Sequence, residues 1–166
     1  LLDLRDYCAS ELVKETANTE PLTFVLTIVP YLRQVMAATA IEEYRCRPIY
    51  DRHFRYRPDD DHFEDSKLDD SLLAASVHSL ETLAKAAPDT IQNILADLAA
   101  DPYEASQFLL YRGLSAGGEY FADWAARLLL EGGRRLYCGY ISDVNWVARE
   151  LVRAIAPYVT DEAHQQ

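Results

Sequence analysis

The order of apolar and polar residues predicts helices along most of the chain. In residues 4–17, apolar side chains recur at the spacing of one helical face, and this face comprises Leu4, Tyr7, Cys8, Leu12 and, less regularly, Val13. A second helix is predicted from about residue 22 to residue 44, with Pro21 suited to its first turn. Its first half is apolar on nearly every side, so we expect it to be buried, with a kink at Pro30.

The helical pattern stops in residues 45–70, where prolines interrupt a sequence without an apolar stripe. A connection of this length is long for a compact domain, and such loops are usually functional or disordered. The sequence therefore predicts one long irregular loop over residues 45–70.

A helix with a regular apolar face follows the loop. Its cap candidates are Asp69, Asp70 and Ser71, and it is expected to stop at Pro88. The apolar face comprises Leu72, Leu73, Val77, Leu80, Leu83 and Ala84.

The next two predicted helices repeat this design. Asp89 or Thr90 is expected to cap the first of them, whose stripe comprises Ile91, Ile94, Leu95 and Leu98. The second is expected to stop at Gly117 and Gly118 and to turn inward Tyr103, Phe108, Leu109, Tyr111 and Leu114.

Further helices are predicted toward the end of the chain. One covers residues 119–131 and ends at Gly132–Gly133, and another follows a cap at Asp143. A last helix is predicted to begin at Thr160 or Asp161. The segment "RRLYCGY" in residues 134–140 is the one short stretch whose sequence fits an extended conformation.

The predicted helices recur at a regular interval. Starts near Ser71, Tyr103 and Asp143 lie 32 and 40 residues apart, with two helices in each unit. This is the length of helical-hairpin repeats such as HEAT. We therefore predict an all-α, right-handed α-superhelix of HEAT-like helical hairpins, with about eight helices and one long loop, as a single domain over residues 1–166.

Composition and charge narrow the class of protein. Hydrophobic residues make up 49% of the chain, enough for a packed core, and the net charge is −11. An acidic surface repels phosphate backbones, so nucleic acid is not an expected partner. Cys8, Cys46 and Cys138 show no CxxC or zinc spacing and are expected to be buried free thiols in a reducing compartment.

The ends of the chain and its longest apolar run bear on location. The first residues carry acids where a signal peptide needs a basic start, and residues 21–32 are too short to span a bilayer. We expect a cytoplasmic protein without a membrane partner. The chain begins without Met and stops within a predicted helix, so we also expect a fragment of a longer protein.

The first half of the loop, "RCRPIYDRHFRYR", combines basic and aromatic residues. Such a mixture can bind phosphates and stack bases, or anchor a protein interface. We favour instead arginines that pair with neighbouring carboxylates and aromatics that fix the loop to the helices. The candidate binding residues are Arg47, Arg52, His53, Arg55, Tyr56 and Arg57, together with Arg134 and Arg135, which follow a helix end where cations suit the helix dipole.

The acidic half of the loop and the histidines give little support for catalysis. A divalent metal could be held by Asp59, Asp61, His62 and Glu64, but an EF-hand is not expected because Glu64 stands where that loop needs glycine. We expect solvated charges there, with no metal and no catalytic residue. The letters "DEAH" in residues 161–164 match a helicase box, but no P-loop and no apolar strand precede them, so we do not interpret them as one. Trp124 and Trp146 lie at helical spacing among apolar residues and are expected in the core.

Residues 100–157 resemble the helical repeat region of large bacterial STAND-type NTPases, which have a NACHT-like ATPase core and a C-terminal superhelix. The matching elements are "PYEASQFLLYRGL", "FADWAARLLLEGGRRL" and "GY" followed by "WVARELVRAI", and the stretch "RPIYDRHFRYRP" followed by "LDDSLLAA" also fits that region. The resemblance implies a role in antiphage defence, in which the superhelix senses an invader molecule or relays its binding. The chain has no GxxxxGK[ST] loop, so ATP and Mg would bind parts of the protein outside it.

These observations together predict a non-enzymatic recognition or scaffold segment with no cofactor of its own. The expected partner is a protein, either invader-derived or the chain's own NTPase core, with oligomerisation through domains outside this chain. Two alternatives stay open. One is a free-standing helical interaction adaptor, and the other is a metal-dependent nuclease or phosphohydrolase that uses the 45–70 loop.

Overall fold

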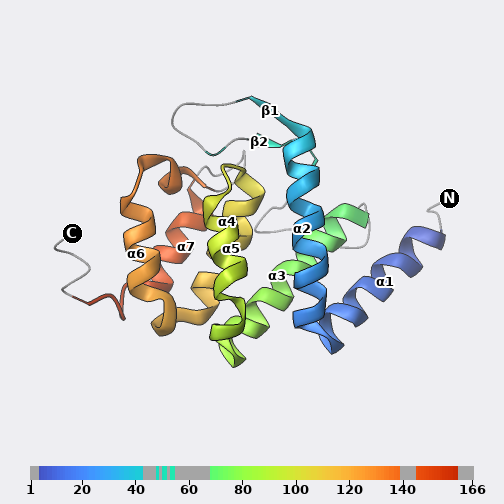
Figure 1. Ribbon diagram of the computed structural model, residues 1–166, viewed down its shortest axis with the longest axis horizontal. Coiled ribbons are helices and arrows are strands. Elements are labelled where there is room, and N and C mark those ends of the chain that lie inside the picture. The colour runs from blue at the N-terminus through green and yellow to red at the C-terminus, as the bar shows by residue number, and fades with distance from the viewer. Residues whose placement is uncertain are drawn as a thin grey trace.

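The computed structural model describes residues 4–42, 48, 50–51, 53–54, 68–138 and 145–160, and these residues are mostly helical (Figure 1). The α-helices are α1 (Leu4–Thr19), α2 (Pro21–Thr39), α3 (Leu68–Ala86), α4 (Gln92–Ala100), α5 (Glu104–Gly117), α6 (Ala122–Leu130) and α7 (Trp146–Ile155). Short 3₁₀ turns cover Pro88–Ile91, Gly118–Phe121 and Gly133–Tyr137, and a small antiparallel pair joins β1 (Ala40–Glu42) to β2 (Tyr50–Asp51).

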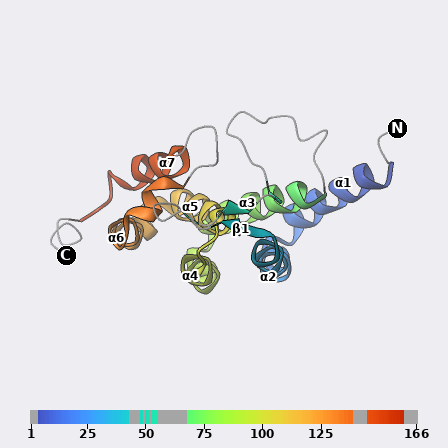
Figure 2. The ribbon, with the colours of Figure 1, turned by 90° about the horizontal axis from the view of Figure 1, so that it is seen from above.

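The helices lie in two layers. Figure 2 shows α2, α4 and α6 in one layer and α1, α3, α5 and α7 in the other. In the second layer α3 packs against α1 and α5, and α5 packs against α7. Each helix of the first layer packs on the helix that follows it in the chain: α2 on α3, α4 on α5, and α6 on α7. The predicted all-α class is confirmed, whereas the described part of the chain shows seven α-helices and does not confirm the count of about eight.

Helix α5 forms the centre of the core. It packs against helices of both layers, and these helices cover its apolar side chains. As their spacing predicts, the side chains of four residues are 0% exposed: Phe108, Leu109, Tyr111 and Leu114. Tyr103, just before the helix, is half-buried. Each such Phe or Leu contributes about 1.5–3 kcal/mol by leaving water. Gly118, with φ of +46°, ends α5 at the predicted stop, where a side chain would be strained.

The apolar face predicted for α3 is also confirmed, since every one of its six residues is buried. Small polar residues complete this helix where it meets α1. The hydroxyl groups of Ser10 and Ser71 lie 3.0 Å apart, and Ser79 donates to the carbonyl oxygen of Ala17 at 3.3 Å. These bonds satisfy buried hydroxyls while letting the two helices approach closely.

Helix α2 differs from the prediction in length and burial. It ends at Thr39, because the next residues pair as β1 with β2 instead of continuing the helix. Only one side is covered by other helices, so Leu22, Leu26 and Tyr31 are exposed. The helix continues through Pro30, which lies on the exposed side, where water can reach the carbonyl group left without a donor.

Among the helices that the structure describes, α2 alone is long and apolar enough to cross a membrane by length and composition. This is weak evidence, because the core helix of a soluble protein passes the same test. Five of its residues belong to the hydrophobic core: Phe24, Val25, Val29, Leu32 and Met36.

The apolar face predicted for the first helix is wrong in part. Cys8 is exposed and Leu12 is 64% exposed, whereas Val13 is half-buried and Ala17 is buried. Helix α1 lies at the edge of its layer, so fewer of its positions find a neighbour. The side chains of residues 4 and 7 lie outside the described part of the structure.

Several predicted helix boundaries also move. Helix α3 begins at Leu68, so Asp69 and Asp70 lie in its first turn, where their charges suit the positive end of the helix dipole. Asp89 and Thr90 belong to a 3₁₀ turn before α4 and do not cap it. In the segment predicted as extended, residues 134–137 belong to the 3₁₀ turn Gly133–Tyr137, whereas Cys138 after them is extended. The cap at Asp143, the last predicted helix and most of the 45–70 loop fall outside the described residues.

Candidate functional site

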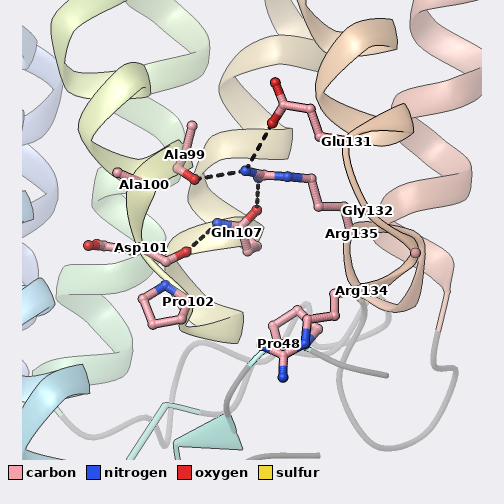
Figure 3. A pocket seen from close by; sticks show the side chains of 11 residues that line it. Pro48, Ala99, Ala100, Asp101, Pro102, Gln107, Glu131, Gly132, Arg134 and Arg135 are labelled. Atoms are coloured by element: carbon pink, nitrogen blue, oxygen red, sulfur yellow. Dashed lines mark hydrogen bonds and ion pairs between the residues drawn. The ribbon is translucent and has the colours of Figure 1, made fainter. Parts of the chain in front are cut away.

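A pocket of about 340 Å³ opens where α4 and α6 end and α5 begins, close to the 3₁₀ turn Gly133–Tyr137 (Figure 3). It brings together both arginines predicted after α6, Arg134 and Arg135, and adds Pro48 from the long loop. We call it the end pocket. Its other lining residues are Ala99, Ala100, Asp101, Pro102, Gln107, Glu131, Gly132 and Gly133.

Arg135 joins three parts of the end pocket. Its guanidinium donates to the side-chain oxygen of Gln107 at 2.7 Å and to the carbonyl oxygen of Ala99 at 3.0 Å (Figure 3). It also lies 3.6 Å from the carboxylate of Glu131. The carbonyl group of Ala99 is at the C-terminal end of α4, where a cation is favourable. Arg135 therefore stabilises the end of α4, not the end of α6 as its place in the sequence predicts.

Gln107 completes the polar contacts at this end of α4. Its side-chain nitrogen donates to the carbonyl oxygens of Leu98 at 3.1 Å and Asp101 at 2.8 Å. The last carbonyl groups of a helix lack partners within it, so a buried amide that donates to them removes a desolvation cost. With Gln107 only 3% exposed, its hydrogen bonds fix the turn between α4 and α5.

Asp101 extends the network to α2. Two nitrogens of Arg33 donate to its carboxylate oxygens at 2.6 and 2.8 Å, and the hydroxyl group of Ser106 lies 3.0 Å from it. A two-point Arg–carboxylate pair is among the strongest hydrogen-bonded contacts in proteins. The hydrogen bond with Asp101 raises the pKa of Arg33, so this cation stays charged at any working pH.

What remains at the mouth of the end pocket is a mixed surface. Arg134 lies beside Pro48 in Figure 3, away from the contacts of Arg135. A Cβ added to Gly132 or Gly133 would meet nothing within 4 Å, so backbone is open to a binding partner there. The guanidinium group of Arg134, the exposed ring of Pro102 and the accessible peptide groups suit contact with a polypeptide.

The candidate residues of the long loop are only partly described. Arg47, Arg52, Arg55, Tyr56 and Arg57 lie outside the described residues. His53 is half-buried, and its Nε2 atom bonds to the carboxylate of Asp69, which also accepts a hydrogen bond from Tyr31 at 3.4 Å. Its ring meets that of Phe54 edge-on at 5.1 Å, and Phe54 is 0% exposed. His53 and Phe54 thus fix their part of the loop to the helices, as the favoured interpretation predicts.

A second groove, of about 420 Å³, lies between α1 and α3. At its edge Arg112 of α5 contacts Glu81 of α3 at 2.6 Å and Glu150 of α7 at 3.0 Å. Lys14, which pairs with Glu11 at 2.9 Å, also lines this groove. One side chain therefore ties three neighbouring helices of a layer together.

The described part of the chain offers few side chains suited to catalysis. Within it, no group of three or more His, Cys, Asp or Glu side chains could hold a metal ion, and residues 59–67 lie outside it. Cys138 is buried, and burial raises the pKa of its thiol well above the ordinary 9.0, which makes it a poor nucleophile. Trp146 is buried against Phe108 and Trp124 packs against Phe121, so both are structural, as predicted.

The network residues Gln107, Asp101 and Arg33 were not among the sequence candidates. Gln107 carries one indirect sign, since it stands within the otherwise apolar inward face of "YEASQFLLY". A buried glutamine must find partners, and helix ends offer them. Arg33 has no comparable sign, because its partner is 68 residues away.

Comparisons with known proteins return no relative: no family model matches the chain, and no curated protein or solved structure is significantly similar to it.

Proposed function

We propose that this chain is a non-enzymatic scaffold that recognises a protein partner, built as an α-superhelix of HEAT-like hairpins. Support comes from the order of the layers. The pairs α2–α3, α4–α5 and α6–α7 each place one helix in either layer, and helices of the α3 layer contact their immediate neighbours. Contacts between adjacent units are the basis of helical-repeat proteins, which use their extended faces for binding.

One observation carries the choice of a binding role: the polar groups of the end pocket are engaged in holding helix ends. Arg135 donates to the carbonyl oxygen of Ala99, and Gln107 donates to that of Asp101. The carboxylate of Asp101 accepts hydrogen bonds from Arg33 of α2. These bonds fix the shape of the pocket. A rigid rim bearing Arg134, the exposed Pro102 and open glycine backbone is suited to a complementary protein surface. In this proposal Arg134 is the main contact residue, and Pro48 of the long loop lies beside it.

The wider setting that we propose is the repeat region of a STAND-type NTPase of antiviral defence. This part rests on the resemblance of residues 100–157 alone. The complete gene tests it directly: a GxxxxGK[ST] loop and a Walker-B strand encoded with this chain would support the setting. A complete protein without them would leave a free-standing interaction adaptor.

Binding measurements test the role of the end pocket. The tagged protein is used to isolate partners, and each purified partner is then titrated against the wild type, Arg134→Glu and the control Arg153→Glu. We expect Arg134→Glu to weaken binding about tenfold or more, as for a central interface arginine. Arg153 is exposed on α7, so its reversal should leave the affinity unchanged.

Two results would contradict the proposal. Equal affinity of all three proteins would place the binding surface elsewhere. Hydrolysis of nucleic acid or of a phosphodiester by the purified chain with Mg²⁺ or Mn²⁺, abolished by chelator, would instead favour the metal-dependent enzyme.

A further inference from the structure

An apolar groove of about 260 Å³ runs between α1 and α2, at the opposite end of the molecule from α6 and α7. Figure 1 shows these two helices meeting at their joint and diverging from it. Leu72 of α3 contributes to the wall between them. The remaining lining residues are Leu12, Val13, Thr16, Thr23, Phe24, Thr27 and Ile28.

Two of the three threonines of this groove turn their hydroxyl hydrogens to their own helices. Thr16 donates its hydroxyl hydrogen to the carbonyl oxygen of Leu12, and Thr27 donates to that of Thr23, each at 2.8 Å. Both hydroxyl hydrogens are therefore used within their own helices. Leu12, on the same wall, keeps 64% of its surface exposed. The groove thus presents apolar surface that gains free energy when it is covered.

The layers explain the shape of the groove. In the described residues, the layer of α1 contains four helices and the layer of α2 contains three (Figure 2). Figure 2 shows no described helix beyond α2 on the side of α1, so the outer side of α2 is open there. The groove is the position that one more helix of that layer would occupy.

Charge selects what kind of helix fits. Glu11, Glu15 and Glu20 are all exposed on α1 and on its joint with α2. At 100° per residue, Glu15 lies 60° from Leu12 around α1, so it flanks the groove. The nearest cation on α1, Lys14, pairs with Glu11 and lines the separate groove toward α3. The flank of the apolar groove is therefore acidic.

We infer that the α1–α2 groove binds an amphipathic α-helix of a partner protein, with an apolar stripe flanked by Lys and Arg. Helix-in-groove recognition of this type uses anchors at spacings of three and four residues. A second copy of the chain fits poorly, because each copy carries a net charge of −11. The inference rests on the proposed scaffold function and names a second contact surface, distant from the end pocket.

A designed peptide tests the inference without knowledge of the natural partner. The probe is a fluorescent peptide of about five helical turns, with Leu at helical spacing on one face and Lys elsewhere. Two matched peptides serve as controls: one has the same residues in scrambled order, and the other has Glu in place of Lys. Binding is followed by fluorescence anisotropy against the wild type, Leu12→Asp and Leu130→Asp.

We expect saturable binding of the Leu/Lys helix and binding at least about tenfold weaker for both control peptides. Leu12→Asp should weaken binding about tenfold, since it removes an anchor from the groove. Leu130→Asp adds the same charge at a side chain that is 69% exposed on α6, and it should leave the affinity unchanged. Non-specific attraction to an acidic protein would be kept or strengthened by either variant, so the pair separates the two causes.

The inference is overturned if Leu12→Asp and Leu130→Asp bind the Leu/Lys peptide as tightly as the wild type. It is also overturned if sedimentation shows a dimer that Leu12→Asp dissociates, because a second copy then fills the groove. Arg134→Glu should not affect the peptide. If the peptide does not bind at the groove, the test of the end pocket with Arg134→Glu is unaffected. If Arg134→Glu has no effect on partner binding, the test of the groove is likewise unaffected.

Discussion

The end pocket and the α1–α2 groove lie at two ends of the same helical stack, yet their chemistry is opposite. In the end pocket, polar groups find partners: Arg135 donates both to the side-chain oxygen of Gln107 and to the carbonyl oxygen of Ala99. In the groove, apolar groups such as Leu12 lack a cover. The end pocket is therefore held in shape by its own hydrogen bonds, whereas the apolar surface of the groove is stabilised only when a partner covers it.

Removal of the central cation should break this contrast most strongly. Arg135→Ala leaves the side-chain oxygen of Gln107 and the carbonyl oxygen of Ala99 without their donor. We expect the free energy of unfolding to fall by about 2–4 kcal/mol, because unsatisfied buried polar groups keep their desolvation cost. Urea unfolding followed by circular dichroism measures the change.

Two further variants control this result. Arg153→Ala, an exposed arginine, should change stability by less than about 0.5 kcal/mol. Gln107→Leu should be destabilising by itself but add less in the Arg135→Ala background, because the two side chains share a hydrogen bond. Strict additivity would show that the network does not act as a unit.

Alkaline pH should weaken the end pocket by a smaller amount. Tyr111 donates its hydroxyl hydrogen to the carbonyl oxygen of Arg135 at 2.8 Å, and burial raises its pKa above the ordinary 10.0. Burial likewise raises the pKa of Cys138 above 9.0. Above these ordinary values the unfolded chain loses protons that the folded chain keeps. Stability should therefore fall as pH rises past about 9 to 10, by at most about 1.4 kcal/mol per pH unit for each group.

Urea midpoints between pH 8 and pH 10.5 measure this slope. Tyr111→Phe and Cys138→Ala should each reduce it, since neither replacement can ionise. A slope that persists unchanged in the double variant would assign the alkaline effect to other groups.

The smallest stability effect is expected at the groove. Leu12→Asp should alter the free energy of unfolding by less than about 0.5 kcal/mol, because the side chain is already mostly in water. A thermal melt is sufficient to measure it. A loss of several kcal/mol would show that Leu12 is covered in solution, and the contrast between the two sites would disappear.

Sequence patterns predicted the core helices because their burial is local in origin. The faces of α3 and α5 repeat at helical spacing and have neighbours on both sides, so periodicity and burial coincide. The same reasoning failed at Leu12, because a helix at the edge of a layer buries only part of its apolar face. Periodicity also predicted too long an α2, because Ala40–Glu42 pairs as a strand with Tyr50–Asp51 instead of continuing the helix.

The site could be predicted only as a list of charged residues. Arg134 and Arg135 stood out, but the partners of Arg135 lie 28 and 36 residues away. Hydrogen bonds between distant segments depend on how helices stack, which periodicity does not contain. The place of Gln107 within an apolar face indicated burial, but its partners at the end of α4 became evident only once the helices were placed beside one another.

The contacts of Arg112 have a mechanical consequence. Its guanidinium holds Glu81 of α3 and Glu150 of α7 at the same time, and all three side chains are partly buried. To bend the stack at its middle, α3 and α7 must move relative to α5, and this would lengthen one of the two contacts. We expect the middle of the molecule to be stiff, so a displacement at one end is passed to the other as a tilt of the whole stack and is not absorbed on the way.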